Sequence, residues 1–389
     1  MSSCSPQPLV LMAGEPSGDI LGSRLMAALK KQAPNKFTFY GVGGAEMLAE
    51  GLNPFFPLAD LNIMGLTETV SKVGTILKRL RDAKKKILQL NPSAVITIDF
   101  PGFNFRLARA LRGHGIPLIH YVAPTIWARH KDKRGVKFAQ VYDHLLSLFP
   151  FEAPFFKDVL LPISFVGHPV MELSAPQNGQ PYRDIIPNPG EKIAIAVLPG
   201  SRMSEVRKLI PIFQQTIHLL KTKYPKIEVK IPVVPEVASY IESTKNGWDV
   251  PVEIVCGPLN ERQKIYEQCW LALAASGSIS LELARAQLPM LITYKVSRLT
   301  AFIAKRILAI KYVCLLNLLQ DKLLVPEFLQ ENCQPEQLSM EIIKLLETPL
   351  RRSAQVTATQ ESLSLLKPKE GCPSERAAQV VLTLLNSKK

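Results

Sequence analysis

The stretch Ala94–Leu107, with the sequence AVITIDFPGFNFRL, is the part of the chain that decides the fold. Residues 95–98 form an apolar, β-branched run of strand length, which predicts a strand buried on both faces. Phe100-Pro101-Gly102 cannot continue a strand, and a helical pattern follows from Phe105. Asp99 is therefore expected at the carboxyl end of a parallel strand, where open α/β sheets bind their ligands.

A carboxylate at this position has two interpretations. It can take part in ligand binding or chemistry, or it can serve only as a turn residue and helix cap. Asn104 is the better candidate for the cap. Position alone leaves both interpretations of Asp99 open.

The chain opens with the same pattern of strand, small-residue turn and helix. Residues 9–13 predict a strand and residues 20–31 a helix. The turn between them presents backbone N–H groups to a ligand, and its candidate site residues are Glu15, Ser17, Gly18 and Asp19. The alternative, which the sequence alone favours, is a plain turn capped by Ser17 or Asp19. The turn is not a G-x-G-x-x-G sequence, so no dinucleotide cofactor is expected.

Composition divides the chain into parts. Residues 169–190 are rich in proline and glycine, and the alternation of strands and helices restarts after them. We therefore predict an N-terminal Rossmann-like domain at 1–168, a linker at 169–190 and a second Rossmann-like domain at 191–348. Helices at 349–389 are expected to pack back on the N-terminal domain. The fold class is α/β, with two parallel sheets facing a central cleft.

Two turns in the second half resemble anion-binding sites. Each joins a predicted strand to a predicted helix, and together they contain Gly200, Ser201 and Arg202, and Ser276, Gly277 and Ser278. Arg202 adds a forked charge suited to phosphate. Glu282 lies one turn into its helix, where it can accept hydrogen bonds from sugar hydroxyls. These features predict a nucleotide-sugar site, and no metal is expected because the chain has neither an Asp-x-Asp nor a His/Cys cluster.

The segment 62–90 combines an apolar stripe at helical spacing with a cluster of basic residues. A basic amphipathic helix can lie on an anionic membrane, and we expect this contact at Lys72, Lys78, Arg79 and Arg81. The alternative is a core helix with a solvated face. The formal net charge of +14 likewise implies an anionic partner: a nucleic acid, a phosphorylated metabolite or a membrane surface.

Other features of the sequence bear on the cellular compartment in which the protein is expected. No apolar run approaches the length of a membrane-spanning helix, and the N-terminus lacks the basic region of a signal peptide. The six cysteines are scattered without metal-type pairs or a disulfide pattern. A cytoplasmic location is expected.

Eight motifs, in this order and spacing, resemble the lipid-A-disaccharide synthase family of inverting GT-B glycosyltransferases. They are AGEPSGD (13–19), GVGG (41–44), IMGLTE (63–68), IDFPGFN (98–104), FVGHP (165–169), LPGSR with EVRKL (198–209), ASGSISLE (275–282) and LLNLL through VPEFLQ (315–330). The match runs nearly from end to end. It departs from the family at Ala123, Thr125 and Arg129, around Trp127.

The resemblance implies transfer of diacylglucosamine from UDP to the 6-hydroxyl of diacylglucosamine 1-phosphate. Asp99 would be the general base, while Arg202 and the turn at 276–278 bind UDP. Glu282 would take the ribose, and Asn317 belongs to the same cleft. The resemblance also implies no cofactor, a peripheral position on the inner face of the cytoplasmic membrane of a Gram-negative-type bacterium, and a homodimer with an exchanged C-terminal segment.

Two other functions compete with this one. A UDP-sugar 2-epimerase, or a related transferase with a soluble acceptor, shares the UDP turns but does not need the basic helix. A nucleic-acid-binding protein would interleave aromatic and basic residues, whereas here the basic residues cluster on amphipathic helices. We therefore expect no nucleic-acid partner.

Overall fold

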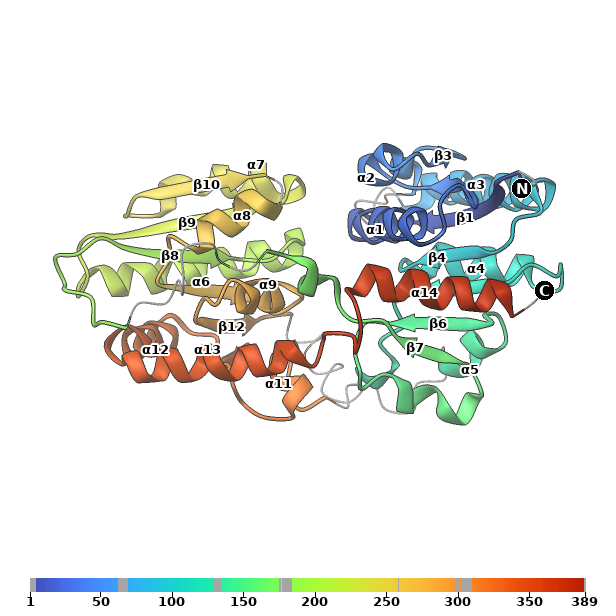
Figure 1. Ribbon diagram of the computed structural model, residues 1–389. Coiled ribbons are helices and arrows are strands. Elements are labelled where there is room, and N and C mark those ends of the chain that lie inside the picture. The colour runs from blue at the N-terminus through green and yellow to red at the C-terminus, as the bar shows by residue number, and fades with distance from the viewer. Residues whose placement is uncertain are drawn as a thin grey trace. The chain divides into compact units, whose positions relative to one another are not determined.

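The computed structural model describes residues 5–61, 69–128, 134–174, 176, 184–257, 259–297, 301 and 310–387, without the side chains of 69–73 and 259–260. The chain forms two compact units: Met1–Glu172 with Leu366–Lys389, and Leu173–Leu365 (Figure 1). Each unit contains one sheet, in which every pair of neighbouring strands is parallel. The predicted α/β class with two Rossmann-like domains is confirmed.

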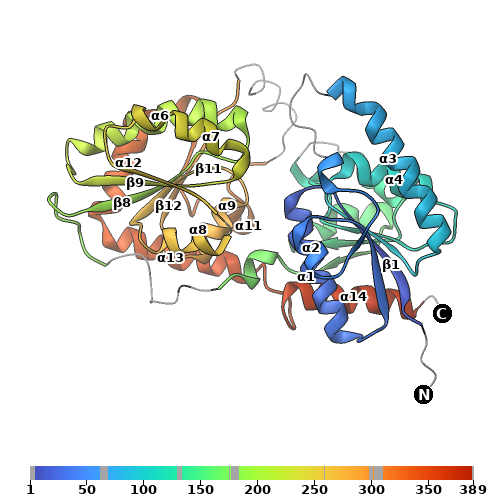
Figure 2. The same ribbon diagram turned by 90° about the horizontal axis from the view of Figure 1, so that it is seen from above.

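The first unit contains a seven-stranded sheet of order β3-β2-β1-β4-β5-β6-β7. Its strands are β1 (Gln7–Ala13), β2 (Phe37–Val42), β3 (Asn53–Pro54), β4 (Val95–Ile98), β5 (Leu118–Tyr121), β6 (His144–Ser147) and β7 (Ile163–Phe165). Its helices are α1 (Pro16–Gln32), α2 (Ala45–Ala49), α3 (Thr69–Leu90), α4 (Pro101–Leu111), α5 (Arg134–Ala139) and α14 (Pro373–Asn386). Figure 2 shows α3 and α4 on one face of this sheet and α1 and α14 on the other.

The second unit contains a six-stranded sheet of order β10-β9-β8-β11-β12-β13. Its strands are β8 (Ile193–Leu198), β9 (Ile227–Val233), β10 (Val252–Cys256), β11 (Leu271–Ala275), β12 (Met290–Tyr294) and β13 (Glu327–Leu329). Its helices are α6 (Met203–Lys221), α7 (Pro235–Ser243), α8 (Leu259–Tyr266), α9 (Ile279–Arg285), α11 (Leu315–Gln320), α12 (Pro335–Glu347) and α13 (Pro349–Ser364). In Figure 2, α6 and α12 cover one face of the sheet, and α9 and α13 cover the other.

Each sheet has one point where the strand order reverses, because helices leave its central strands toward opposite faces. In the first sheet the reversal lies between β1 and β4, and in the second between β8 and β11. All residues of β4, β8 and β11 are buried, as expected for strands covered on both faces. Ligands of doubly wound sheets bind at this reversal, outside the carboxyl ends of the strands.

The C-terminal helices divide between the units, so the predicted packing of 349–389 on the N-terminal domain holds for α14 alone. The side-chain amide of Gln355 on α13 bonds both backbone groups of Met290, the first residue of β12, which places α13 in the second unit. The helix α14 instead packs along α1. The first unit also extends to Glu172, four residues into the predicted linker.

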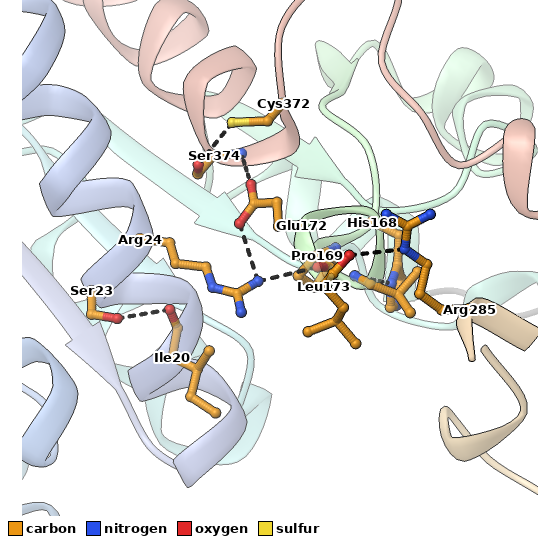
Figure 3. Close-up of polar contacts among 11 residues, drawn as sticks. Ile20, Ser23, Arg24, His168, Pro169, Glu172, Leu173, Arg285, Cys372 and Ser374 are labelled. Atoms are coloured by element: carbon orange, nitrogen blue, oxygen red, sulfur yellow. Dashed lines mark hydrogen bonds and ion pairs between the residues drawn. The ribbon is translucent and has the colours of Figure 1, made fainter. Parts of the chain in front are cut away.

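Polar contacts attach α14 to the first unit (Figure 3). The Arg24 guanidinium on α1 donates to Pro169 O and to Glu172 Oε2, both at 3.1 Å. The other Glu172 oxygen accepts the backbone N–H of Ser374 at 2.6 Å, in the first turn of α14. Lys31 on α1 pairs with Glu375 at 2.7 Å. These contacts join segments that lie between 145 and 344 residues apart in the sequence.

His120 on β5 is packed in the core of the first unit. Its side chain is 1% exposed, and Nδ1 lies 2.7 Å from Thr97 Oγ1 on β4. Burial lowers the pKa of His120 to about 3, so the imidazole is neutral at physiological pH.

Candidate functional site

Asp99 follows β4 at the reversal point of the first sheet. Ala13 of β1 lies opposite Ile98 of β4, so the turn after β1 and the turn containing Asp99 leave the sheet side by side. Glu15 and Ser17 are exposed in the first of these turns. The two stretches that the sequence singles out in the first half are therefore neighbours in space, at the edge where ligands bind.

The backbone at Asp99 is strained. Asp99 and Phe100 both have a φ of +47°, in the left-handed region that costs a residue with a side chain about 1–2 kcal/mol. The Asp99 N–H donates to Tyr121 O at 2.9 Å. The Asn104 amide nitrogen donates to three carbonyls: Asp99 O at 2.8 Å, Met12 O at 3.0 Å and Ile98 O at 3.1 Å. Strain held in this way is typical of functional positions.

Asn104 is therefore not the helix cap that its position suggested. Helix α4 begins at Pro101, earlier than predicted, because proline fits the first position of a helix. Phe100 occupies the N-cap position without a side-chain cap bond. Asn104 lies inside the helix, fully buried, and its amide reaches the ends of β1 and β4.

Gly14 allows Phe100 to pack on the turn after β1. A Cβ at Gly14 would lie 2.2 Å from the Phe100 ring, a distance that real Cβ atoms do not reach. The ring therefore occupies the space that any other residue at position 14 would fill. Gly14 and Asn104 were not predicted as site residues, although both stabilise the Asp99 turn.

The carboxyl group of Asp99 has a raised pKa. Burial raises the pKa by disfavouring the charged form, and the backbone N–H of Phe100 opposes this effect. A carboxyl whose pKa is displaced toward neutrality is suited to accepting a proton from a substrate.

Asp19 and Gly18 are buried, unlike Glu15 and Ser17. The Asp19 carboxylate accepts three backbone N–H groups at the start of α2, from Gly44 at 2.7 Å, Met47 at 3.0 Å and Glu46 at 3.1 Å. Asp19 therefore caps the neighbouring helix α2. The plain-turn alternative had instead expected it to cap its own helix, α1.

In the second unit, the two predicted anion-binding turns meet at the reversal point of the sheet. Leu198 of β8 lies opposite Ala274 of β11. Gly200 has a φ of +107°, and a Cβ built on it would lie 3.5 Å from that of Ala275. The structure therefore brings Gly200, Ser201 and Arg202 beside Ser276, Gly277 and Ser278.

The side chains of these turns differ in availability. Arg202 is the N-cap residue of α6, and its side chain is 78% exposed, with Glu205 at 3.2 Å. Gly277 and Ser278 are exposed before α9, whereas the Ser276 hydroxyl donates to Val313 O at 2.8 Å. This edge of the sheet thus offers an exposed cation beside exposed backbone and hydroxyl groups.

Glu282 belongs to a buried polar cluster with two residues of α8 that sequence reasoning missed. Arg262 Nη1 lies 4.0 Å from Glu282 Oε2. Glu282 Oε2, Arg262 Nε and the Tyr266 hydroxyl are buried without a hydrogen-bond partner. Burial raises the pKa of Glu282, and Arg262 opposes the rise. Buried polar atoms without partners are rare, so this cluster has capacity for a polar ligand group.

Asn317, in contrast, makes its hydrogen bonds within the chain. It is fully buried; its nitrogen donates to Val325 O and Glu327 Oε1, both at 2.8 Å. Its oxygen accepts the N–H groups of Leu324 and Val325, both at 2.9 Å. Glu327, which was not predicted, also accepts the N–H of Cys314 at 3.0 Å, before α11. Asn317 and Glu327 therefore hold the loop 321–325 against α11.

The basic helix α3 has a buried and an exposed side. Ala83 and Ile87 are fully buried, whereas Lys78 and Arg81 are exposed. Arg79 lies 2.6 Å from Asp60 and over the Phe56 ring, so its charge is neutralised within the fold. Of the residues predicted to contact a membrane, Lys78 and Arg81 are thus exposed cations, whereas Arg79 belongs to an ion pair within the fold.

Some predicted positions lie outside the described residues: the IMGLTE motif at 63–68, the side chain of Lys72, and Arg129. Among the helices that are described, none has the length and apolarity to cross a membrane. In the same part of the chain, no group of three or more His, Cys, Asp or Glu side chains is placed to hold a metal ion.

Comparison with known proteins decides the family. The family model of lipid-A-disaccharide synthetase matches residues 9–381, which is nearly the whole chain. The chain belongs to the lipid-A-disaccharide synthase family. It is 41% identical over 386 residues to the lipid-A-disaccharide synthase of Rhodospirillum centenum, covering 98% of this chain and 96% of the relative. It is 40% identical to that of Paramagnetospirillum magneticum, covering 98% of both.

Solved structures with low sequence identity share the fold of this lipid-A-disaccharide synthase family member. A putative UDP-N-acetylglucosamine 2-epimerase from Listeria monocytogenes superimposes with a TM-score of 0.64 at 14% identity, covering 98% of this chain and 96% of that one. The glycotransferase of kitacinnamycin gives a TM-score of 0.61 at 13% identity, covering 98% and 99%. These likenesses establish the GT-B architecture of two Rossmann-like units.

Proposed function

We propose that this enzyme of lipid A biosynthesis transfers 2,3-diacylglucosamine from its UDP derivative to 2,3-diacylglucosamine 1-phosphate. The product is a β-1′,6-linked disaccharide 1-phosphate, and UDP is released. The family membership supports the reaction. The observation that carries the mechanism is Asp99, a partly buried carboxyl on a strained turn at the reversal point of a parallel sheet.

Asp99 acts as the general base in this proposal. Its carboxylate takes the proton of the acceptor 6-hydroxyl as that oxygen attacks the anomeric carbon of the donor. The bond from this carbon to the diphosphate breaks on the opposite face, so the configuration inverts, and the electron pair leaves with UDP. The raised pKa of Asp99 makes its carboxylate a better proton acceptor than an ordinary aspartate.

The second unit binds the donor. Gly200, Ser201 and Arg202, with Ser276, Gly277 and Ser278, surround the diphosphate, and Arg202 neutralises the charge that develops on it. Glu282 accepts hydrogen bonds from the ribose hydroxyls through Oε2, which has no hydrogen-bond partner among the described residues. Asn317 acts indirectly, by holding the loop 321–325, because its own hydrogen-bonding groups are already used.

A direct test of the reaction is UDP release by the purified chain with and without a lipid acceptor. We expect release that depends on diacylglucosamine 1-phosphate, and formation of the disaccharide 1-phosphate. UDP release without any lipid would instead indicate an epimerase or a transferase with a soluble acceptor.

The raised pKa of Asp99 predicts the pH dependence of turnover. A general base works in its ionised form, so the rate falls as the pH falls through its pKa. We expect the midpoint of the acid limb of kcat to lie above 3.8, the ordinary pKa of aspartate. The acceptor phosphate itself titrates near pH ~6, so the profile is repeated with an acceptor that lacks the phosphate. A limb near the ordinary value with both acceptors contradicts the assignment.

The exposed side of α3 is proposed to contact the inner face of the cytoplasmic membrane, where the acylated substrates reside. Leu77 is 42% exposed next to Lys78, and Arg81 lies one turn further along the same side. An apolar residue beside two cations is suited to an anionic interface. The family resemblance further implies a homodimer with an exchanged C-terminal segment, which stays a prediction.

Reversing the two exposed charges tests the membrane contact. Each basic residue near an anionic surface contributes about 1 kcal/mol, so Lys78→Glu with Arg81→Glu is expected to reduce binding to anionic vesicles about tenfold or more. Flotation at physiological salt measures this. The control is Lys226→Glu with Lys369→Glu, which changes the net charge equally at exposed positions elsewhere. Equal loss in both double variants would show that only net charge matters.

A further inference from the structure

An apolar hollow of about 170 Å³ lies beside the Asp99 turn in the first unit. Its lining residues come from the loop before α3, from α3 itself and from the start of α4: Leu61, Ile76, Phe100, Gly102, Phe103 and Arg106. Phe103 is 2% exposed and Leu61 is 1% exposed, so the hollow reaches into the hydrophobic core. Phe100, which directly follows Asp99, forms part of its wall.

Gly102 and Arg106 lie four residues apart on α4, and therefore on one face of the helix, about 6 Å apart along its axis. A Cβ at Gly102 would meet no atom within 4 Å, so this side of the hollow is open. Arg106 is exposed at the rim. Among the described residues, no ion pair or side-chain hydrogen bond engages Arg106, whereas Arg79 nearby on α3 is paired with Asp60.

These features match a ligand with an apolar chain and an anionic group close together. A cavity with apolar walls excludes charge, and the arginine fork at its rim suits a phosphate. The hollow adjoins the turn of the carboxyl group that is proposed to deprotonate the acceptor, because Phe100, which directly follows Asp99, forms part of its wall. The donor's phosphates, in the proposal above, are held by the turns of the second unit. An anion held by Arg106, in the first unit, would therefore be the acceptor's own phosphate.

We propose that Arg106 binds the phosphate of the acceptor lipid, and that the hollow receives the first methylene groups of one of its acyl chains. This inference rests on the proposed function. It makes Arg106 the residue that distinguishes a phosphorylated acceptor from an unphosphorylated one. It also makes the hollow a determinant of acyl-chain preference. Gly102 keeps the hollow open, because it has no side chain to fill it.

The first experiment compares Arg106→Gln with the wild type on two acceptors, diacylglucosamine 1-phosphate and the same compound without phosphate. A hydrogen-bonded charge contact corresponds to a factor of about 10–100 in kcat/KM. We expect this loss on the phosphorylated acceptor, and less than about twofold change on the other, since the lost partner is already absent there. Arg106→Lys should recover part of the activity. The matched control, Arg109→Gln, removes an exposed charge one turn further along α4 and should change neither value.

The assays use short-chain, water-soluble acceptors without vesicles, so that a contact with membrane phospholipid cannot produce the effect. If Arg106→Gln reduces activity only when vesicles are present, the arginine binds bilayer headgroups and the proposal is overturned. Equal losses on both acceptors, or no loss, would overturn it as well. Wild-type protein that forms no disaccharide would contradict the proposed function itself, which separates the two failures.

The second experiment fills the hollow. Gly102→Leu adds a side chain into open space on a helical residue, so neither a clash nor backbone strain is expected. Each buried methylene of a ligand contributes up to about fourfold in affinity. The wild type should therefore prefer longer acyl chains over the first few methylenes, and Gly102→Leu should lose this preference while Gly102→Ala keeps it. A chain-length profile unchanged by Gly102→Leu would rule out the hollow as the acyl site.

Discussion

Asp99→Asn is expected to lower kcat by about 10²–10⁴, the range that a positioned general base contributes. The substitution removes the proton acceptor but keeps the size of the side chain. Asparagine also tolerates the left-handed conformation that the backbone adopts at this residue. The fold of the turn, with its bonds from Asn104 and to Tyr121 O, should therefore be retained.

UDP binding by the same variant separates chemistry from structure. Calorimetric titration should give a UDP affinity within about twofold of the wild type, because the donor site is assigned to the second unit. Asp99→Ala should behave similarly in both assays. Turnover within tenfold of the wild type would remove Asp99 from the mechanism, and a parallel loss of UDP binding would show that it supports the donor site instead.

Asp19→Ala is expected to have the largest effect on stability. The carboxylate accepts three N–H groups at the start of α2, and hydrogen bonds to charged groups are each worth about 1.5–3 kcal/mol. Because such contributions are not fully additive, we expect a loss of about 3–5 kcal/mol from the first unit. Hydrogen exchange at the amides of Gly44, Glu46 and Met47 should accelerate most.

Ser17→Ala provides the control, because Ser17 lies in the same turn but is exposed. It should leave the exchange of the α2 amides unchanged. The sequence also allowed Asp19 a place among the ligand-binding residues of the first turn. If Asp19→Ala keeps normal amide exchange and loses turnover, that interpretation is correct and the capping role is secondary.

Much of the candidate site was predictable because it depends on local pattern. A buried run followed by Asp99 and a helix breaker indicates a strand end, and in a parallel sheet strand ends share one edge. The same logic predicted the turns at 200–202 and 276–278. Which strands become neighbours was not predictable, yet the pairs β1 with β4 and β8 with β11 bring these turns together.

The missed residues act through contacts with other elements of the fold. Arg262 and Tyr266 lie on α8 and Glu282 lies on α9, with β11 between these helices in the sequence. The three residues come together only in the folded chain. Arg79 appeared to be one of several basic residues on a helix, but Asp60, which lies before α3, neutralises its charge. Asparagine is a common helix cap, so the sequence suggested this role for Asn104. Only the packing of α4 against β1 and β4 brings three carbonyls within reach of its amide.

The order of residues along the chain was sufficient to establish the two α/β units, their strand ends and the family, because periodicity and motif spacing are properties of neighbouring residues. Tertiary packing alone decided which polar groups are already used, as at Asp19, Asn317 and Arg79. It also decided which groups have no hydrogen-bond partner among the described residues, as at Glu282 Oε2 and Arg106. The physical reason is that a side chain's hydrogen-bonding and charge capacity depends on whichever groups surround it in space, and most of these come from distant parts of the chain.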